Sequence, residues 1–183
     1  MGKKPATYAD LEALPPNRVG EIIAGELYSS PRPAVPHAFA SSALGGSLIG
    51  PFGQGRGGPG GWIILFEPEL HLGEDVLVPD FAGWRVERLP RAPRTAAMKL
   101  APDWLCEVIS PSTEARDRSI KLAAYAREGV RNVWFLDPDV RTLEVLRQEG
   151  TRYTLLATHV GDERVRAEPF EALELELRLL WVD

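Results

Sequence analysis

Residues 104–113, with the sequence Trp-Leu-Cys-Glu-Val-Ile-Ser-Pro-Ser-Thr, decide the fold of this chain. The first six residues are almost all apolar, which is typical of a short strand buried on both faces of a sheet. The proline ends this strand, and the serine and threonine after it can cap a helix. The sequence then predicts a helix over residues 114–128, ended by a glycine, and a second buried strand over residues 132–136. Such a strand–helix–strand unit joins two parallel strands.

The other predicted strands are short and meander along the chain, so the sheet should be mixed. We expect them at residues 22–23 and 27–28 (a hairpin with its turn at 24–25), 62–66, 69–72, 76–78, 142–146 and 153–156, with residues 81–86 continuing strand 76–78. Helices are predicted over residues 7–14 and 37–49. The fold class is therefore α/β, or α+β with a mixed central sheet flanked by helices.

The composition fits a single domain over residues 1–183. No run of about 20 apolar residues could span a membrane, and the amino-terminal residues lack the apolar core of a secretory signal. The only cysteine, Cys106, is expected to be a buried, reduced thiol in a cytoplasmic protein. The net charge of −5 argues against a protein that coats nucleic acid, but it is compatible with an acidic metal site.

Two further segments carry a pattern. Residues 51–61 are rich in glycine and proline but lack the Gly-Lys-Ser/Thr of a phosphate-binding loop, so we expect a surface loop there. Residues 173–179 alternate strictly between leucine and charged residues, which predicts a half-exposed strand or an edge strand open to a partner chain. This edge leads to the hypothesis of a homodimer.

Glu107 is out of place, because it lies in the middle of the most apolar strand of the chain. Burying a carboxylate is costly unless it is paired or bound to a metal ion. Strand alternation places Glu107 on the same face as Leu105 and Ile109. It is therefore either the ion-pair partner of an arginine or lysine, or a metal ligand or general acid/base.

Asp80 is the second anomaly, because it interrupts another apolar run. Pro79 before it forces a break in sheet pairing, which could aim the side chain of Asp80. The alternative is an ordinary turn aspartate. A second Pro-Asp pair occurs at Pro102-Asp103, at the start of a strand, where a cap or turn role is the simpler interpretation.

Lys121 lies on the predicted helix in one stripe with Asp117 and Tyr125, at a spacing of four residues. The tight connection after the strand brings the first turns of this helix near Glu107. The lysine could therefore reach that carboxylate, or it could form an ordinary surface pair with Asp117.

These residues belong to a longer pattern. Residues 102–113 are followed by Asp117, Lys121, Tyr125, Gly129-Val130 and Val133-Trp-Phe-Leu-Asp-Pro138, and preceded by Glu21-Ile-Ile-Ala-Gly-Glu-Leu27, His37 and Val78-Pro-Asp80. In this order, over roughly residues 7–180, the pattern resembles the Uma family of bacterial "putative restriction endonucleases". That family is assigned to the PD-(D/E)XK nuclease superfamily.

The resemblance implies a metal-dependent endonuclease that acts on DNA. It implies Asp80 and Glu107 as the metal-binding carboxylates, Lys121 as the catalytic lysine, and Glu21 as a further catalytic acid. The alternative for Glu21 is a solvated residue of the hairpin. The usual lysine of the superfamily lies two residues after the glutamate, where this chain has Ile109. The resemblance therefore implies an amine that reaches the site from the following helix.

Mg²⁺ suits these residue types, because it takes oxygen ligands and keeps several waters, and Mn²⁺ should substitute for it. The ion would polarise a phosphoryl oxygen and lower the pKa of a water molecule. Lys121 would orient or deprotonate this water, or offset charge in the transition state. The histidines (His37, His71 and His159) are scattered and lack zinc-site spacing. His37 could lie at the mouth of the site, although a structural role is the simpler interpretation.

A basic segment follows Asp80 in the sequence. Residues 85–99 carry one acid, Glu87, and five bases, Arg85, Arg88, Arg91, Arg94 and Lys99. This segment could contact DNA phosphates beside the site, or it could be a solvated loop.

Two alternatives to a DNA endonuclease stay open. One is a catalytically silent protein of the same fold that binds nucleic acid or protein, which Ile109 in place of the usual lysine keeps in view. The other is a metal-dependent hydrolase of a small phosphoester. Fold-level analogy supports a class of reaction and not a substrate.

Overall fold

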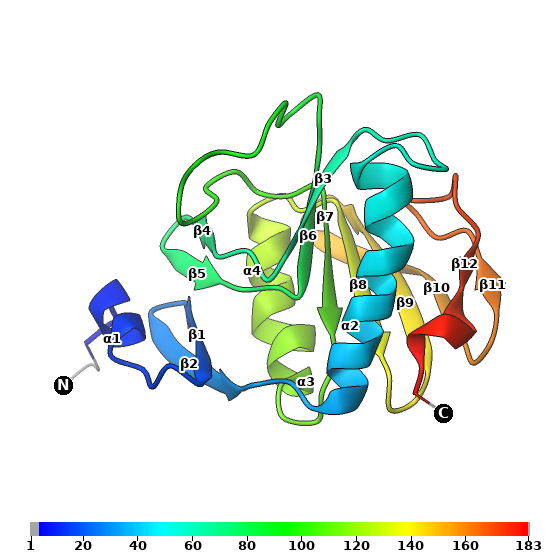
Figure 1. The fold of residues 1–183 in the computed structure, drawn as a ribbon. Coiled ribbons are helices and arrows are strands. Elements are labelled where there is room, and N and C mark those ends of the chain that lie inside the picture. Colours follow the sequence, from blue (N-terminus) through cyan, green and yellow to red (C-terminus); the bar gives the residue numbers. More distant parts are fainter. Residues whose placement is uncertain (1–3, 183) are drawn as a thin grey trace.

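A six-stranded sheet forms the centre of the molecule in the computed structural model, which describes residues 4–182 (Figure 1). Its strand order is β10-β9-β8-β7-β6-β3. The strands are β3 (Trp62–Phe66), β6 (Phe81–Arg85), β7 (Trp104–Val108), β8 (Asn132–Asp137), β9 (Thr142–Glu149) and β10 (Arg152–Val160). β7 and β8 are parallel and the other neighbours are antiparallel, so the predicted mixed sheet is confirmed.

A smaller sheet lies beside the first, with the order β2-β1-β5-β4. It comprises β1 (Arg18–Ile23), β2 (Glu26–Pro31), β4 (Leu70–Leu72) and β5 (Asp75–Leu77). The hairpin β1–β2 turns at Ala24-Gly25 as predicted, with φ values of 52° and 77°, which suit a tight hairpin turn. The short helix α1 (Tyr8–Glu12) precedes this sheet, and the side chain of Asp10 accepts a hydrogen bond from the Thr7 N–H at 2.7 Å.

The prediction that residues 81–86 continue strand 76–78 is wrong. β5 belongs to the small sheet and β6 to the central sheet, so the chain crosses between the two sheets in the segment that contains Pro79-Asp80. Pro79 has no N–H with which to extend the pairing of β5, which favours a break at this point. The crossover leaves Asp80 between the sheets, directly before β6.

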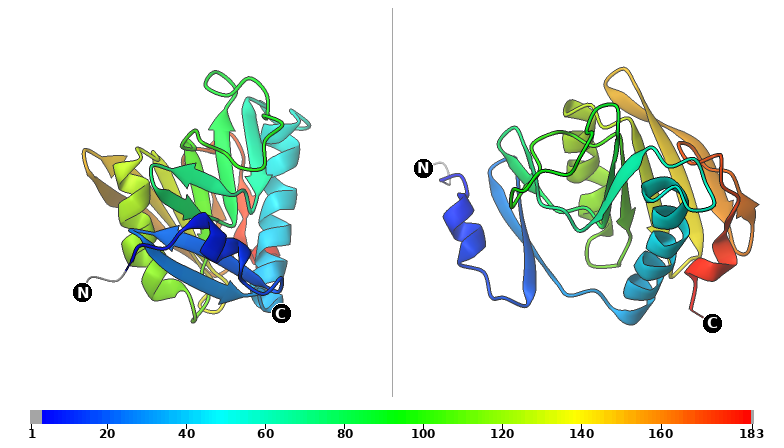
Figure 2. Two further views of the ribbon diagram at one scale, coloured as in Figure 1. Left: turned by 90° about the vertical axis from the view of Figure 1, so that its left-hand side faces the viewer. Right: turned by 45° about the horizontal axis from the view of Figure 1, so that its top comes forward.

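Helices cover both faces of the central sheet (Figure 2). One face packs against α2 (Val35–Leu48), which begins two residues before the predicted start. The other packs against α3 (Glu114–Arg116), η2 (Asp117–Lys121) and α4 (Leu122–Arg127), which together correspond to the predicted helix 114–128. Among residues 4–182, no helix combines the length and apolarity that crossing a membrane requires.

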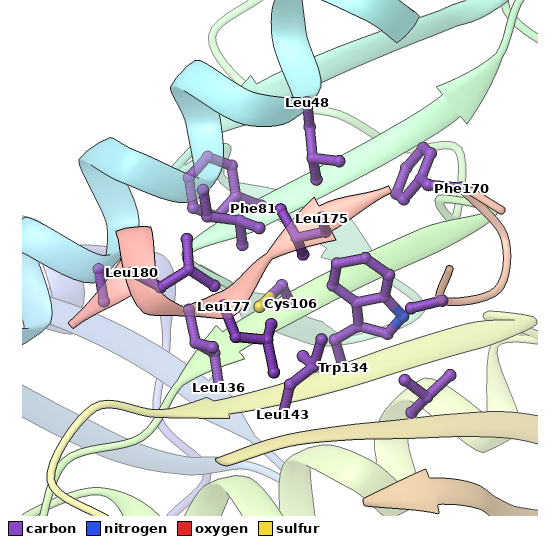
Figure 3. Close-up of a cluster of buried hydrophobic side chains, with 14 of the residues drawn as sticks. Leu48, Phe81, Cys106, Trp134, Leu136, Leu143, Phe170, Leu175, Leu177 and Leu180 are labelled. Carbon is purple, nitrogen blue, oxygen red and sulfur yellow. The ribbon is translucent and has the colours of Figure 1, made fainter. Parts of the chain in front are cut away.

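β7 lies inside the central sheet, and all five of its residues are buried. Its side chains alternate as predicted. Trp104, Cys106 and Val108 join the core beneath α2, whereas Leu105 joins the core on the α4 side. Figure 3 shows Cys106 within the core beneath α2. Glu107 points to the α4 side, because the hydroxyl of Tyr125 on α4 hydrogen-bonds to it.

Two other segments differ from the predictions. The alternating residues 173–179 do not form a strand of that length, because only β12 (Leu175–Glu176) pairs, with β11 (Arg164–Val165). The chain then turns into the 3-10 helix η3 (Leu177–Leu180), and both leucines that bound it are buried in the core of their own chain. The edge on which the homodimer hypothesis rested is therefore absent from this segment, and the homodimer stays a prediction.

The glycine-rich segment 51–61 is a loop only in part. Its first residues continue α2 as a π-helical turn, η1 (Ile49–Gly53), and Phe52 from this turn is buried. From residue 54 the chain forms an irregular surface loop, as predicted.

Candidate active site

A cavity of about 300 Å³ opens at the carboxyl end of β7. Asp80, Glu107, Lys121 and Glu21, which the sequence singled out, all line it. Five more ionisable residues share its wall: Arg32, His37, Glu67, Arg116 and Asp117. The structure therefore brings the four predicted residues together, although they come from both sheets and from the helix after β7.

Glu107 is 2% exposed and has two partners in the protein. The Nζ atom of Lys121 lies 2.8 Å from its Oε1 atom, and the hydroxyl of Tyr125 donates to the same oxygen at 2.5 Å. Both contacts fall on Oε1, so Oε2 is the oxygen left for a ligand. The buried carboxylate is thus an ion-pair partner, and it also faces the cavity as a metal ligand would.

Lys121 is 2% exposed, so the alternative of a surface pair with Asp117 is wrong. Its Nζ atom lies 2.9 Å from Oε1 of Glu21 and 3.6 Å from Oδ1 of Asp117, in addition to its contact with Glu107. The five residues of η2 form a π-helical turn with Asp117 and Lys121 at its ends. Such turns occur frequently at functional sites.

The protonation of this cluster follows from its burial and charge. Burial lowers the pKa of Lys121, but the carboxylates of Glu107, Glu21 and Asp117 more than offset this effect and raise its pKa above the usual range. Burial raises the pKa of Glu107 well above its usual range, and the Lys121 ammonium opposes this shift. The acidic groups around Lys121 thus favour its charged form, so the ammonium keeps its proton.

Asp80 is held by the end of β7 and by α2. Its Oδ2 atom accepts a hydrogen bond from the Val108 N–H at 2.7 Å, and its Oδ1 atom lies 3.1 Å from Nε2 of His37. Burial lowers the pKa of His37, but the hydrogen bond and charge of Asp80 outweigh it, so the net shift of this pKa is upward. Asp80 is therefore not an ordinary turn aspartate, and His37 lines the cavity, where the sequence left its place open.

Glu21 is 4% exposed, so the alternative of a solvated hairpin residue is wrong. Its Oε1 atom accepts the Val78 N–H at 2.9 Å as well as contacting Lys121. Its Oε2 atom lies 3.6 Å from Nη2 of Arg116. Glu21 thus ties the small sheet to the helix after β7.

Among the ionisable residues of this cavity, sequence reasoning missed three: Arg32, Arg116 and Glu67. Arg116 lies among polar residues in the first helical turn, where no pattern distinguishes it from a surface residue. Glu67 follows β3 with a φ of 44°, and its N–H donates to the backbone oxygen of Asp80 at 2.9 Å. Neither a motif nor an apolar period marks Glu67, because its role depends on the meeting of two chain segments.

The basic segment 85–99 lies away from the cavity, and none of its residues lines it. Asp80 precedes β6, whereas Arg85 ends it, so the segment leaves from the opposite end of the sheet (Figure 1). There Asp103 accepts the Arg85 N–H at 2.9 Å and pairs with Nη1 of Arg88 at 2.8 Å. The segment therefore does not lie beside the site as expected, and its contact with DNA stays a prediction, while Asp103 makes local contacts of the kind expected for it.

The carboxylate oxygens of the cavity suit a small, hard cation only if water and phosphate oxygens of a substrate complete its coordination. Among residues 4–182, no three His, Cys, Asp or Glu side chains are arranged to hold a metal ion. Mg²⁺, however, is usually bound by one or two carboxylates, with water and substrate phosphates as its other ligands. Asp80 and Glu107 can supply those two carboxylates.

Three buried atoms of the cavity lining have no hydrogen-bond partner: His37 Nδ1, Arg116 Nε and Asp117 Oδ1. Unpaired polar atoms of this kind are uncommon in protein interiors and are typical of a wall that contacts a polar ligand.

Comparison with known proteins identifies the family of this chain. Residues 5–179 match Uma2, whose description is "Putative restriction endonuclease". The chain belongs to the Uma2 family. No curated protein matches the chain significantly.

A solved structure shares the fold of this Uma2 chain. It is described as "a putative nuclease belonging to DUF820 from Anabaena variabilis ATCC 29413". The alignment covers 96% of the Uma2 chain and 97% of that chain, with 23% identity and a TM-score of 0.76. The similarity confirms the fold, with its mixed central sheet and the helices that flank it.

Proposed function

We propose that this protein is a metal-dependent endonuclease that hydrolyses phosphodiester bonds of DNA through a PD-(D/E)XK-type site. The observation that carries the proposal is the contact of 2.8 Å between Nζ of Lys121 and Oε1 of Glu107. This contact supplies an amine to the acidic strand residue, although the strand itself has Ile109 where the usual lysine would stand. The family description points to the same class of reaction.

The roles of the residues follow from their contacts. Asp80 and Glu107 would hold Mg²⁺, or Mn²⁺ in its place, and the ion would stabilise charge on the phosphate and make water more acidic. The raised pKa of Lys121 keeps its amine protonated. Lys121 therefore offers a positive charge and a hydrogen-bond donor to the phosphate and the attacking water. Glu21 fixes Lys121 from the opposite side.

The experiment is a cleavage assay on supercoiled plasmid DNA with millimolar Mg²⁺ or Mn²⁺. The wild type should nick or linearise the plasmid, and a chelator should stop it. Glu107→Gln keeps the shape of the side chain but removes its charge, and it should lower the rate about 100-fold or more, since a metal contact is worth several kcal/mol. The matched control is Glu144→Gln, because Glu144 lies on β9 and pairs with Arg118 outside the cavity. Equal rates for both variants would contradict the proposal.

A second candidate has one observation in its favour. Lys121 is already enclosed by Glu21, Glu107 and Asp117, so the acidic cluster has a cation of its own. A silent nuclease-fold protein that binds nucleic acid or protein could keep this cluster as a structural ion pair. Calorimetric titration separates the two candidates. An endonuclease should bind Mn²⁺, and both Asp80→Ala and Glu107→Ala should abolish this binding, whereas a silent protein should neither bind Mn²⁺ nor cleave DNA.

Three further expectations accompany the proposal: a single domain over residues 1–183, a homodimer and a cytoplasmic location. The small-phosphoester alternative is tested by the same assay, because such an enzyme would hydrolyse a small diester and ignore plasmid DNA. Light scattering at micromolar concentration tests the homodimer, and a monomer would contradict it.

A further inference from the structure

One wall of the cavity is rich in hydrogen-bond donors and has no part in the proposed metal chemistry. It is formed by Arg116 on α3, Ser30 on β2, and Arg32, which follows β2 and is exposed. The metal carboxylates come from other elements, since Asp80 precedes β6 and Glu107 lies on β7. The cavity therefore offers an anionic substrate two binding positions, one at the metal ion that the carboxylates would hold and one at the wall that is rich in hydrogen-bond donors.

Arg116 is fixed in its position by neighbours that leave one of its donors unused. Its Nη2 atom donates to Oγ of Ser30 at 2.6 Å, and its guanidinium carbon lies 5.6 Å from the ring centre of Tyr28. The side chain is only 14% exposed. Its Nε atom is buried and has no hydrogen-bond partner. The guanidinium has five N–H donors, of which the hydrogen bond to Ser30 uses one, and Arg116 lines the cavity, so it can donate to an oxygen that a ligand brings.

Ser30 supplies a second donor at the same place. Its Oγ atom accepts the hydrogen bond from Arg116, so its own hydroxyl proton is free to be donated to a ligand in the cavity. Two neighbouring donors, one of them on a planar cation, match two oxygens of one phosphate group.

The two acidic side chains nearest Arg116 do not accept hydrogen bonds from it. Oε2 of Glu21 lies 3.6 Å from Nη2, and Oδ1 of Asp117 lies 4.0 Å from Nε. Both distances are longer than a hydrogen bond. The two carboxylates therefore help to hold the cation in place without occupying the guanidinium N–H groups that line the cavity.

We infer that Arg116 and Ser30, with Arg32 at the rim, bind a backbone phosphate of the nucleic acid other than the one that Asp80 and Glu107 would hold. This inference rests on the proposed function and narrows it. The preferred substrate carries at least two phosphates in sequence, so it is a polynucleotide and not an isolated phosphodiester.

The test measures kcat/KM on a DNA duplex over a range of salt concentrations. Each phosphate contact contributes about 0.9 to the slope of log affinity against log salt for duplex DNA. Arg116→Gln should reduce the slope of kcat/KM by about this amount and lower kcat/KM about tenfold or more, as expected for a lost hydrogen bond to a charged group. Hydrolysis of bis(p-nitrophenyl) phosphate, which has no second phosphate, should fall by a clearly smaller factor than the cleavage of DNA.

Three variants guard against a merely structural effect. Arg116→Lys keeps the charge beside Glu21 and Asp117, and it should keep the salt slope while losing part of kcat/KM on DNA. Arg32→Gln alters an exposed residue, so it tests the slope even if Arg116→Gln fails to fold. Arg88→Gln is the matched control, because Arg88 is exposed and pairs with Asp103 at the other end of the sheet. Its slope should equal that of the wild type.

The outcomes separate the inference from the proposed function. If the wild type cleaves DNA but Arg116→Gln and Arg32→Gln keep its salt slope, the phosphate site is wrong and the nuclease stands. A loss of the same size on DNA and on the small diester would also overturn the phosphate site. If the wild type cleaves no DNA with either metal ion, the proposed function fails and the inference fails with it.

Discussion

Two of the three Pro-Asp pairs of this chain make a natural comparison, because each of these two directly precedes one of two neighbouring antiparallel strands. Pro79-Asp80 precedes β6 and Pro102-Asp103 precedes β7, so the two aspartates lie at opposite ends of the central sheet. Asp103 is bound by the Arg85 N–H and by Arg88, whose side chain is 43% exposed. Asp80 is bound by the Val108 N–H and by His37, whose side chain is 13% exposed.

The difference lies in what surrounds each aspartate. At the Asp103 end an exposed arginine pairs with one carboxylate, and such a pair is common at protein surfaces. At the Asp80 end the cavity also holds three buried charged residues, Glu21, Glu107 and Lys121. Charged side chains are almost never fully buried unless they are paired. The comparison shows that the function of a Pro-Asp pair depends on the chain segments that meet there.

The prediction with the largest expected effect tests the difference between the two aspartates directly. Asp80→Asn should lower DNA cleavage about 10³-fold, because a metal contact worth several kcal/mol corresponds to such a factor. Asp103→Asn removes the same charge from the same dipeptide at the other end of the sheet, and it should stay within about threefold of the wild type, a change of less than 1 kcal/mol. Plasmid cleavage rates measure both. A comparable loss in the two variants would mean that position in the sheet does not decide the role of the aspartate.

The second prediction concerns stability. Lys121→Met leaves three carboxylates beside one another in a buried place, and it should lower the free energy of unfolding by about 3–5 kcal/mol. Arg164→Met is the control, because Arg164 also contacts two acids, Glu174 and Glu176, but is 61% exposed. This control should cost less than about 1 kcal/mol. Urea denaturation measures both changes.

The pH dependence of the Lys121→Met variant sharpens the result. The pKa of Glu107 is raised by burial, so a proton on this carboxyl can relieve the uncompensated charge when the pH falls. The deficit of the variant should therefore shrink toward acidic pH. A deficit below 1 kcal/mol at neutral pH would show that the cluster does not depend on the lysine charge.

Much of the fold and part of the site could be predicted from local sequence. The strand 104–109 identifies itself by its apolar run, and Glu107 stands out within it because an unpaired buried carboxylate is costly. Lys121 could be placed near Glu107 because a short connection fixes where the next helix begins. In both cases the evidence lies within about 20 residues of sequence, where the spacing of the residues still determines which side chains can come together.

The rest depended on contacts between distant segments. Residues 173–179 alternate as a strand would, yet η3 buries Leu177 and Leu180 instead, because the core beneath α2 can accept them in a 3-10 turn. The basic segment 85–99 follows Asp80 in sequence but leaves from the other end of β6. The sequence around Arg116 does not distinguish it from a surface residue, because its role depends on its contact with Ser30 on the distant strand β2. Periodicity reports which face is buried, not which distant segment buries it.

The smallest expected effect concerns the pH dependence of the two ends of the sheet. The pKa of His37 is raised above its ordinary value, because Asp80 outweighs the effect of burial. A group whose pKa is higher in the folded protein stabilises it fully below the pKa of the unfolded chain, about 6.5 for histidine, and this stabilisation is lost as the pH rises through the folded pKa. In the presence of a chelator, His37→Gln should therefore be less stable than the wild type at pH 5–6, and the deficit should shrink as the pH rises toward 9.

Arg88→Gln provides the contrast at the Asp103 end, because an arginine keeps its charge throughout this range. Its deficit, measured by urea denaturation at each pH, should be nearly constant between pH 5 and 9. A constant deficit for His37→Gln as well would mean that His37 stays in one protonation state beside Asp80. The pair of His37 with Asp80 would then resemble the pair of Arg88 with Asp103 in its pH dependence, and the two ends would differ in the buried charged cluster around Lys121.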